Sequence, residues 1–313
     1  MGIYTNTSEI SRHTVLNAKL VPDSAHLGSG EVSGLSGIEA SKQLAAWTAV
    51  DRHIKSEHRV VGIGSGESIL CLWITPEIHA SVGSTVPYVV ERIIAQGQEA
   101  NKDRVFIPTG FQSKELIVKG NLVLGDVDQF PSIDVTIDGA DELRTITTAL
   151  GITGSKGGAC HLREKVLAEA AESFIIVADY RKKSVVLGTS WKHGVPIEVV
   201  PFAYVKVLRN LNRLGSPTAA LRMAKAKAGP VVSDNGNFII DAPFDEQYMK
   251  HPLELLSQIK MLTGVVEVGL FCNVAKVAYF GEEVWRCSQI RPLRFLVSFF
   301  PPQDGSVTVR ALD

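Results

Sequence analysis

The chain has 313 residues, of which 45% are hydrophobic and 21% are charged, and its formal net charge is -1. This length can bury a large core in one or two domains. The near-neutral charge gives no reason to expect nucleic acid or a membrane surface as a partner. Four cysteines without CxxC spacing argue against a disulfide framework and a structural zinc site. With no apolar leader and no apolar run of about 18 residues, we expect a soluble cytoplasmic protein.

The first elements follow a ragged start. Residues 1–36 are rich in Ser, Thr and Gly, and we expect them to be flexible. Residues 37–54 have helical spacing of apolar side chains. A short apolar run at 60–61 then leads into the glycine-rich turn GIGSG at 62–66. Residues 86–94 again have a helical pattern.

Short apolar runs then alternate with helical patterns along most of the chain. Helical patterns occur at 162–172 and 203–215. Runs that predict strands occur at 105–107, 133–137, 174–178, 197–200, 231–232, 238–240, 265–268 and 277–280. Alternating strands and helices predict an α/β fold with a largely parallel sheet. From residue 198 the order changes around a hairpin centred on Asn235-Gly236, which predicts a smaller α+β unit near the C-terminal end.

Two carboxylates stand at the end of the predicted strand in IDVTIDGADEL, at Asp138 and Asp141. In open α/β sheets, ligands bind at the carboxyl edge of the strands. The alternative is an acidic turn that caps the next segment.

A lysine and two glycines, Lys156, Gly157 and Gly158, precede a predicted helix that carries Glu164. A glycine-rich amino end of a helix favours anions. A lysine, a glycine loop and a carboxylate suit proton abstraction next to a carbonyl, with an enediolate stabilised nearby. A capped surface helix with Glu164 in an ion pair is the alternative. Lys182 follows a further strand and Asp179, and a solvated basic turn would explain it equally well.

The motifs GIGSG, FQSKELI, IDVTIDGADE, VADYRKK, VPIEVVPFA, DNGNFIID and TGVVEVGLF occur in this order. Together they resemble the type A family of ribose-5-phosphate isomerases, its fungal members above all, from about Lys42 to the C-terminus. The resemblance implies a Rossmann-like domain at 37–197, to which 275–313 return, and a smaller ferredoxin-like α+β lid domain at 198–274. It also implies interconversion of D-ribose 5-phosphate and D-ribulose 5-phosphate through an enediol, in the pentose phosphate pathway. The resemblance implies no metal and no organic cofactor. It implies neither nucleic acid nor a membrane as a partner, and it suggests that the chain forms a homodimer or a homotetramer.

The resemblance also assigns roles to individual residues. Glu164 matches the general base, Asp138 and Asp141 match the acidic pair that contacts the sugar and assists ring opening, and Lys156 matches the catalytic lysine. Strict counting back from Glu164 would place Ser155 there, and we choose Lys156 because a loop can absorb one residue. The residues matched to substrate binding are Ser65, Gly66, Ser84, Thr85, Gly139, Ala140, Gly157, Gly158 and Lys182. Two rival functions are a non-catalytic sugar-phosphate-binding protein and an inactive translation product.

Two blocks interrupt the resemblance, at residues 67–83 and 284–303. Without the first block, Gly66 would join Ser84 and the phosphate loop would be continuous. Without the second, a strand, a turn and a strand would follow one another. Both blocks preserve the reading frame, and their end codons can be written with GT and AG boundaries. We therefore predict retained introns, with native insertion loops as the alternative.

Overall fold

The computed structural model describes residues 37–65, 84–144, 150–152, 160–225, 227–282 and 287–290, all within one compact unit, Gly34–Asp313. Block 67–83 and most of block 284–303 lie outside the described residues. The same is true of Gly66, Lys156, Gly157 and Gly158.

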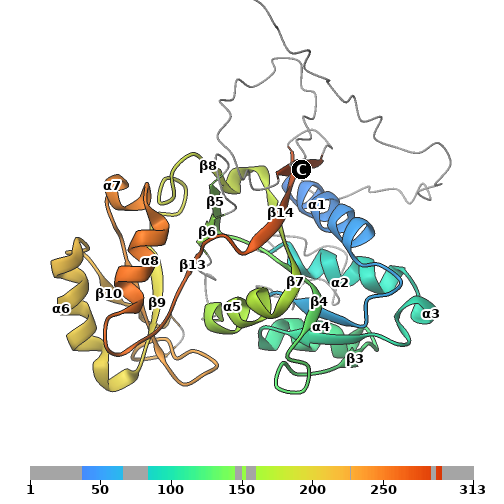
Figure 1. The fold of residues 1–313 in the computed structure, drawn as a ribbon, viewed down its shortest axis with the longest axis horizontal. Coiled ribbons are helices and arrows are strands. Elements are labelled where there is room, and N and C mark those ends of the chain that lie inside the picture. The colour runs from blue at the N-terminus through green and yellow to red at the C-terminus, as the bar shows by residue number, and fades with distance from the viewer. Residues whose placement is uncertain are drawn as a thin grey trace, which may run out of the picture. The chain divides into compact units, whose positions relative to one another are not determined.

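The largest element is a seven-stranded sheet with the order β15-β14-β7-β4-β1-β2-β3 (Figure 1). Its strands are β1 (Val60–Ile63), β2 (Val105–Pro108), β3 (Val123–Leu124), β4 (Ile133–Asp138), β7 (Ala171–Asp179), β14 (Ala275–Gly281) and β15 (Cys287–Ile290). Every neighbouring pair is parallel except β14 and β15. The predicted α/β fold class is therefore confirmed.

Helices cover both faces of this sheet, because alternate strand residues point to opposite faces. They are α1 (Gly37–His53), α2 (Val86–Ala95), α3 (Gln98–Asn101), α4 (Phe111–Lys119) and α5 (His161–Ala170). On β7, Ile175 and Val177 belong to the core formed with α1, α2 and α4. Phe174 and Ile176 belong to a core on the other face, where α5 contributes Ala168.

A second sheet has four antiparallel strands in the order β10-β11-β9-β12. Its strands are β9 (Val195–Val199), β10 (Ala220–Leu221), β11 (Phe238–Ala242) and β12 (Val265–Val268). Beside it lie η2 (Pro201–Ala203), α6 (Tyr204–Leu214), α7 (Glu246–Met249) and α8 (Pro252–Lys260) (Figure 1). Its core joins Ile197 and Ile240 of the strands to Val207 of α6 and Ile259 of α8.

A third, small sheet was not predicted. It has the order β13-β6-β5-β8, from β5 (Glu142–Arg144), β6 (Leu150–Ile152), β8 (Lys183–Ser184) and β13 (Leu270–Phe271). Preceding β8 is η1 (Tyr180–Lys182). These strands have only two or three residues each, too few for alternation of apolar side chains to reveal them.

The strand predicted at residues 231–232 does not form and is replaced by an isolated bridge between Val232 and Phe238. The turn itself is as predicted. Gly236 has φ 79, and the Ser233 amide donates to the Asn237 carbonyl at 2.8 Å. The Ser233 hydroxyl donates to Glu198 at 2.7 Å, so side chains hold this turn in place of a ladder.

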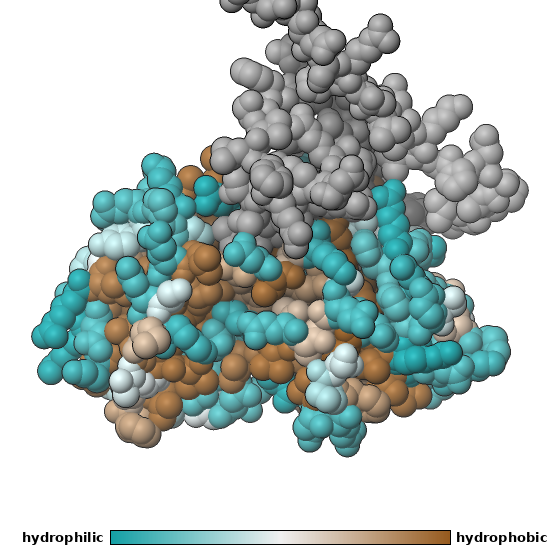
Figure 2. Space-filling view, viewed as in Figure 1, coloured by the Kyte–Doolittle hydropathy of each residue, from teal (hydrophilic) through white to brown (hydrophobic). Residues whose placement is uncertain are grey.

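The surface mixes hydrophobic and hydrophilic residues on the face drawn in Figure 2. The most exposed large hydrophobic side chains of the described chain include Phe202 at 91%, Met261 at 83% and Phe111 at 68%. Among the helices of the described ranges, none has the length and apolar character to cross a membrane.

Candidate active site

The site is built where the chain changes direction in the main sheet. β1 lies between β2 and β4, so the connection from β1 and the connection from β4 lead to opposite sides. Ligands of open α/β sheets bind at such a switch point, beyond the carboxyl ends of the strands. Gly64 and Ser65 follow β1, and Gly139 follows β4.

Two glycines allow β1 and β4 to approach closely here. A Cβ on Gly64 would stand 1.8 Å from Oδ1 of Asp138. A Cβ on Gly62 would stand 2.2 Å from Oγ1 of Thr136. The spacing of the motif GIGSG thus has a packing cause.

Asp138 is a buried carboxyl at 2% exposure. Its Oδ1 accepts the Gly139 amide at 2.7 Å, and its Oδ2 has no hydrogen-bond partner among the described residues. Burial raises the pKa of Asp138 well above its ordinary value, and the charges of Glu164 and Asp141 raise it further. A carboxyl with a raised pKa can hold a proton near neutral pH and donate it.

Glu164 lies in the first turn of α5 and is 4% exposed. It is close enough to Asp138 for its charge to raise the pKa of that carboxyl group. Its amide donates to the Cys160 carbonyl at 2.9 Å, as part of the helix. The Ser65 hydroxyl donates a hydrogen bond to Oε1 of Glu164. The loop after β1 therefore contacts the carboxylate that was predicted to be the base.

The two ends of the interrupted loop meet in the structure. The Ser84 hydroxyl lies 3.4 Å from the Ser65 carbonyl oxygen and accepts the Val86 amide at 3.2 Å. The Thr85 hydroxyl donates to the Val177 carbonyl at 3.0 Å. Ser84 and Thr85 thus stand at the amino end of α2, where backbone amides favour an anion.

A lysine and an aspartate from different segments complete the described site. Lys182 Nζ lies 3.8 Å from Oδ1 of Asp141, and both side chains are mostly buried. Nearby, Arg181 donates two side-chain hydrogen bonds to Asp179, at 2.7 and 3.0 Å. Burial raises the pKa of Asp179, but Arg181 and the charges of Lys182 and Lys42 outweigh it and hold this pKa below its ordinary value.

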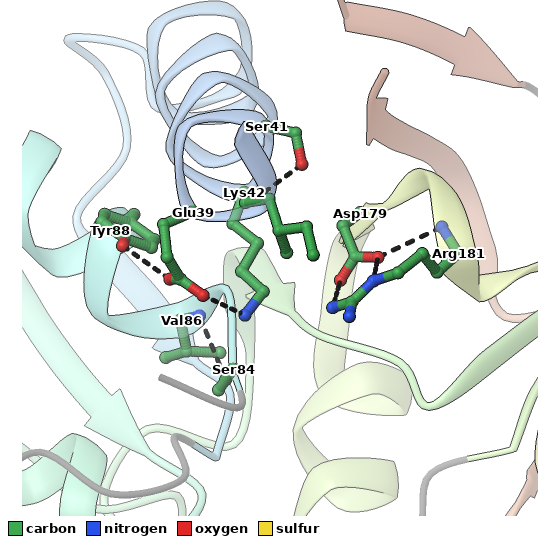
Figure 3. Close-up of polar contacts among 9 residues, drawn as sticks. Glu39, Ser41, Lys42, Ser84, Val86, Tyr88, Asp179 and Arg181 are labelled. Atoms are coloured by element: carbon green, nitrogen blue, oxygen red, sulfur yellow. Dashed lines mark hydrogen bonds and ion pairs between the residues drawn. The ribbon is translucent and has the colours of Figure 1, made fainter. Parts of the chain in front are cut away.

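One buried cluster beside the site was not predicted (Figure 3). Lys42, 3% exposed, donates to Glu39 at 2.7 Å, and the Tyr88 hydroxyl donates to the other Glu39 oxygen at 2.8 Å. In Figure 3 the Lys42 side chain extends from α1 towards Ser84. The sign in the sequence was a Glu and a Lys three residues apart in the first two turns of the predicted helix.

The predicted residues fall into two groups. Ser84 contacts Ser65, and Ser65 contacts Glu164. Lys182 lies beside Asp141, and the charges of Asp141 and Glu164 both act on Asp138. Thr85, Gly139 and Ala140 adjoin these residues in the chain. Gly139 is close to Thr85, since a Cβ there would lie 3.9 Å from the threonine hydroxyl. Gly66, Lys156, Gly157 and Gly158 are outside the described residues.

The chain is similar in sequence to a known protein family and to its curated members. A profile described as "Ribose 5-phosphate isomerase A (phosphoriboisomerase A)" matches residues 105–284. A "Ribose-5-phosphate isomerase" of Cryptococcus neoformans is 60% identical over 287 residues, covering 89% of this chain and 82% of the relative. One of Mycosarcoma maydis is 59% identical over 261 residues, covering 83% of this chain and 84% of the relative.

Solved structures agree. The ribose 5-phosphate isomerase A of Methanocaldococcus jannaschii superposes with a TM-score of 0.67 at 30% identity, covering 81% of this chain and 99% of that one. A D-ribose-5-phosphate isomerase in complex with phospho-erythronic acid superposes with a TM-score of 0.68 at 30% identity, with the same coverage. Sequence and fold thus make the chain an isomerase. It belongs to the ribose 5-phosphate isomerase A family.

Proposed function

We propose that the chain interconverts D-ribose 5-phosphate and D-ribulose 5-phosphate in the pentose phosphate pathway. The observation that carries this proposal is the contact of Ser65 with the buried carboxylate of Glu164, beside Asp138 at the switch point. A base, a proton-holding carboxyl and an anion-binding helix end are the groups that an aldose–ketose isomerase of a phosphorylated sugar needs.

The phosphate would bind at the amino end of α2. Ser65, Ser84 and Thr85 offer hydroxyl groups there, and Gly66 would add its amide. Lys42 extends from α1 towards Ser84 in Figure 3, where its ammonium group is paired with Glu39.

Glu164 would then act on the sugar carbons. It removes the proton from C2 of the open-chain aldose, which leaves an enediolate with its negative charge on the C1 oxygen. A proton then passes from the C2 hydroxyl to the C1 oxygen, and Glu164 returns its own proton to C1 as the C2 carbonyl forms, which yields the ketose. Asp138, with its raised pKa, and Asp141 would contact the sugar hydroxyls and assist ring opening. Lys182 would bind substrate beside Asp141. Lys156 with Gly157 and Gly158 would stabilise the enediolate. This role is assigned from the family resemblance alone.

The organisation of the whole protein is part of the proposal. Residues 37–197 with 275–313 would form the catalytic domain, and 198–274 the smaller lid domain. We expect a cytoplasmic homo-oligomer, as the family resemblance implies. Light scattering on the purified chain would measure its mass.

An isomerase assay on the purified full chain tests the function. We expect D-ribulose 5-phosphate to form from D-ribose 5-phosphate. Binding of phospho-erythronic acid without turnover would indicate a non-catalytic sugar-phosphate-binding protein instead. Neither binding nor turnover would indicate an inactive translation product.

A further inference from the structure

Helix α5 faces three regions: the site, the apolar cores beside the main sheet, and the second sheet. The contact with the second sheet has no part in the proposed chemistry. Glu164 faces the site. Leu167 and Ala168 pack in apolar cores with strands of the main sheet. Lys165 points away from both, towards the second sheet.

The Lys165 side chain is buried between α5 and β12. Its Nζ donates to Oε1 of Glu267 at 2.8 Å and to the Val268 carbonyl at 2.5 Å. It also lies 5.1 Å from the centre of the Phe271 ring. The two charged side chains are only 8% and 12% exposed. A single lysine thus connects the helix of the proposed base to a strand of another sheet.

Burial makes this pair a poor source of stability. Burial lowers the pKa of Lys165. The charge of Glu267 and its hydrogen bond raise this pKa, but they do not overcome the effect of burial. Buried ion pairs often contribute little net stability, because desolvation offsets their attraction. Such a pair instead fixes the orientation of the lysine side chain, because hydrogen bonds to fixed acceptors constrain a side chain more than apolar contacts do.

The neighbourhood of Glu267 increases the need for Lys165. Glu267 stands directly opposite Glu198 on β9. Glu198 is fully buried, and its described partners are the neutral side chains of Ser233, Asn235 and Asn237. Like charges directly opposite one another destabilise a sheet. Lys165 and Lys260 are the two lysines that contact Glu267 in the described chain.

We propose that Lys165 is a positioning residue for the isomerisation: by anchoring α5 to β12, it fixes the rotation of the helix and so the aim of the Glu164 carboxylate. Successive residues of an α-helix differ by about 100° around the axis, so a rotation that moves Lys165 moves its neighbour Glu164 equally. Displacement of a reacting group by about 1 Å can cost roughly 100-fold in rate. This inference rests on the proposed function.

The test compares Lys165→Met with Lys260→Met in the full chain. Lys260 contacts the same carboxylate, at 2.6 Å from Oε2, but it extends from α8 and is 45% exposed. We expect Lys165→Met to lower kcat about 10- to 100-fold while KM and the Kd of phospho-erythronic acid change less than about 3-fold. Lys260→Met should leave kcat within about 2-fold of the unsubstituted chain.

Glu267→Gln keeps the shape of the partner and serves if Lys165→Met fails to fold. We expect it to lower kcat about 3- to 10-fold, again with KM nearly unchanged. Circular dichroism establishes that each variant is folded at the assay temperature. Equal kcat in Lys165→Met and Lys260→Met, or unchanged kcat in Glu267→Gln, would overturn the inference. A lack of turnover in the unsubstituted chain would instead overturn the proposed function.

Discussion

At the scale of single residues, the site separates carboxyl groups by their surroundings. Asp138 is buried beside Glu164 and Asp141, and its pKa is raised. Asp179 is buried as well, yet Arg181 holds its pKa below the ordinary value. Burial with nearby carboxylates thus prepares Asp138 to hold a proton, whereas the pairing with Arg181 keeps Asp179 charged.

Lys182 provides a test of substrate binding. We expect Lys182→Ala to raise KM about 10- to 100-fold, because a hydrogen bond to a charged group contributes about 1.5 to 3 kcal/mol. The change in kcat should be smaller. Lys183→Ala is the matched control, since the adjacent Lys183 pairs with Glu282 instead. Steady-state kinetics measure both, and an unchanged KM in Lys182→Ala would remove this lysine from the site.

Glu142 provides a test of stability against pH. It is fully buried and accepts the amides of residues 188, 189 and 190 at 2.6, 3.0 and 2.8 Å. Burial raises its pKa, but the amides of Ser190 and Gly188, with the side chains of Ser184 and Ser190, outweigh burial and hold this pKa below its ordinary value. The stability that Glu142 contributes is therefore fully present above pH 4.5 and is lost as the pH falls through the lower folded-state pKa.

We expect Glu142→Gln to reduce the free energy of unfolding by about 1 to 3 kcal/mol at pH 7 and to weaken its decline at acid pH. Urea unfolding at several pH values measures this. Glu115→Gln is the control, because Glu115 forms an exposed pair with Lys119 at 3.7 Å and no other ion pair within the described chain. Equal stability of the two variants at pH 7 would contradict the role of Glu142.

At the scale of elements, the spacing of apolar residues predicted the longer helices and strands, because only these contain enough residues for a period to be recognised. The helix predicted at 37–54 is observed as α1, Gly37–His53, and the run at 133–137 as β4, Ile133–Asp138. The helix predicted at 162–172 ends earlier, at Ala170, because β7 already begins at Ala171 and pairs with β4 there. Tertiary pairing outweighed local helical preference at this boundary.

The sequence could not reveal contacts between distant segments. Ser65, Asp138 and Glu164 were placed by motifs, but the hydrogen bond between Ser65 and Glu164 requires the order of the sheet. Lys165 adjoins a motif residue, and yet its partner Glu267 is about a hundred residues away in the chain. Spacing reports only local geometry, so such pairs appear only once the fold is known.

The approach of β1 to β4 gives a prediction at this scale. In Gly64→Ala the new methyl group would overlap Oδ1 of Asp138, which lies 1.8 Å away, and the carboxyl group or the loop must move. We expect kcat/KM to fall at least about 100-fold and the melting temperature to fall as well. Gly37→Ala is the control, because no atom of the described residues lies within 4 Å of its Cβ position. Full activity of Gly64→Ala would show that Asp138 tolerates displacement.

At the scale of the whole molecule, the two blocks at residues 67–83 and 284–303 remain predicted insertions. Four residues of the second block form β15, which pairs antiparallel with residues 278–281 of β14. The rest of both blocks lies outside the described residues. Ser65 and Ser84 nevertheless meet across the first block, and loop closure becomes only slowly more costly with length.

We predict that deleting residues 67–83 and 284–303 together raises kcat/KM at least tenfold and raises the melting temperature. Glu67 follows the phosphate loop, and a carboxylate about 4 Å from a phosphate costs roughly 1 to 4 kcal/mol. Each single deletion separates the effect on the phosphate loop from the effect on β15. Equal activity and melting temperature with and without the blocks would show that they are native loops. A transcript sequence tests retained introns separately.

Turnover in deuterium oxide is the sharpest test of whether Glu164 carries a proton between the two sugar carbons. The base exchanges its proton with solvent, so D-ribulose 5-phosphate formed by the unsubstituted chain should carry deuterium at C1, as NMR can measure. Glu164→Gln should lower kcat about 100- to 10,000-fold and abolish this exchange, while still binding phospho-erythronic acid. Near-normal kcat in Glu164→Gln, or solvent exchange that continues without the carboxylate, would show that Glu164 is not the base.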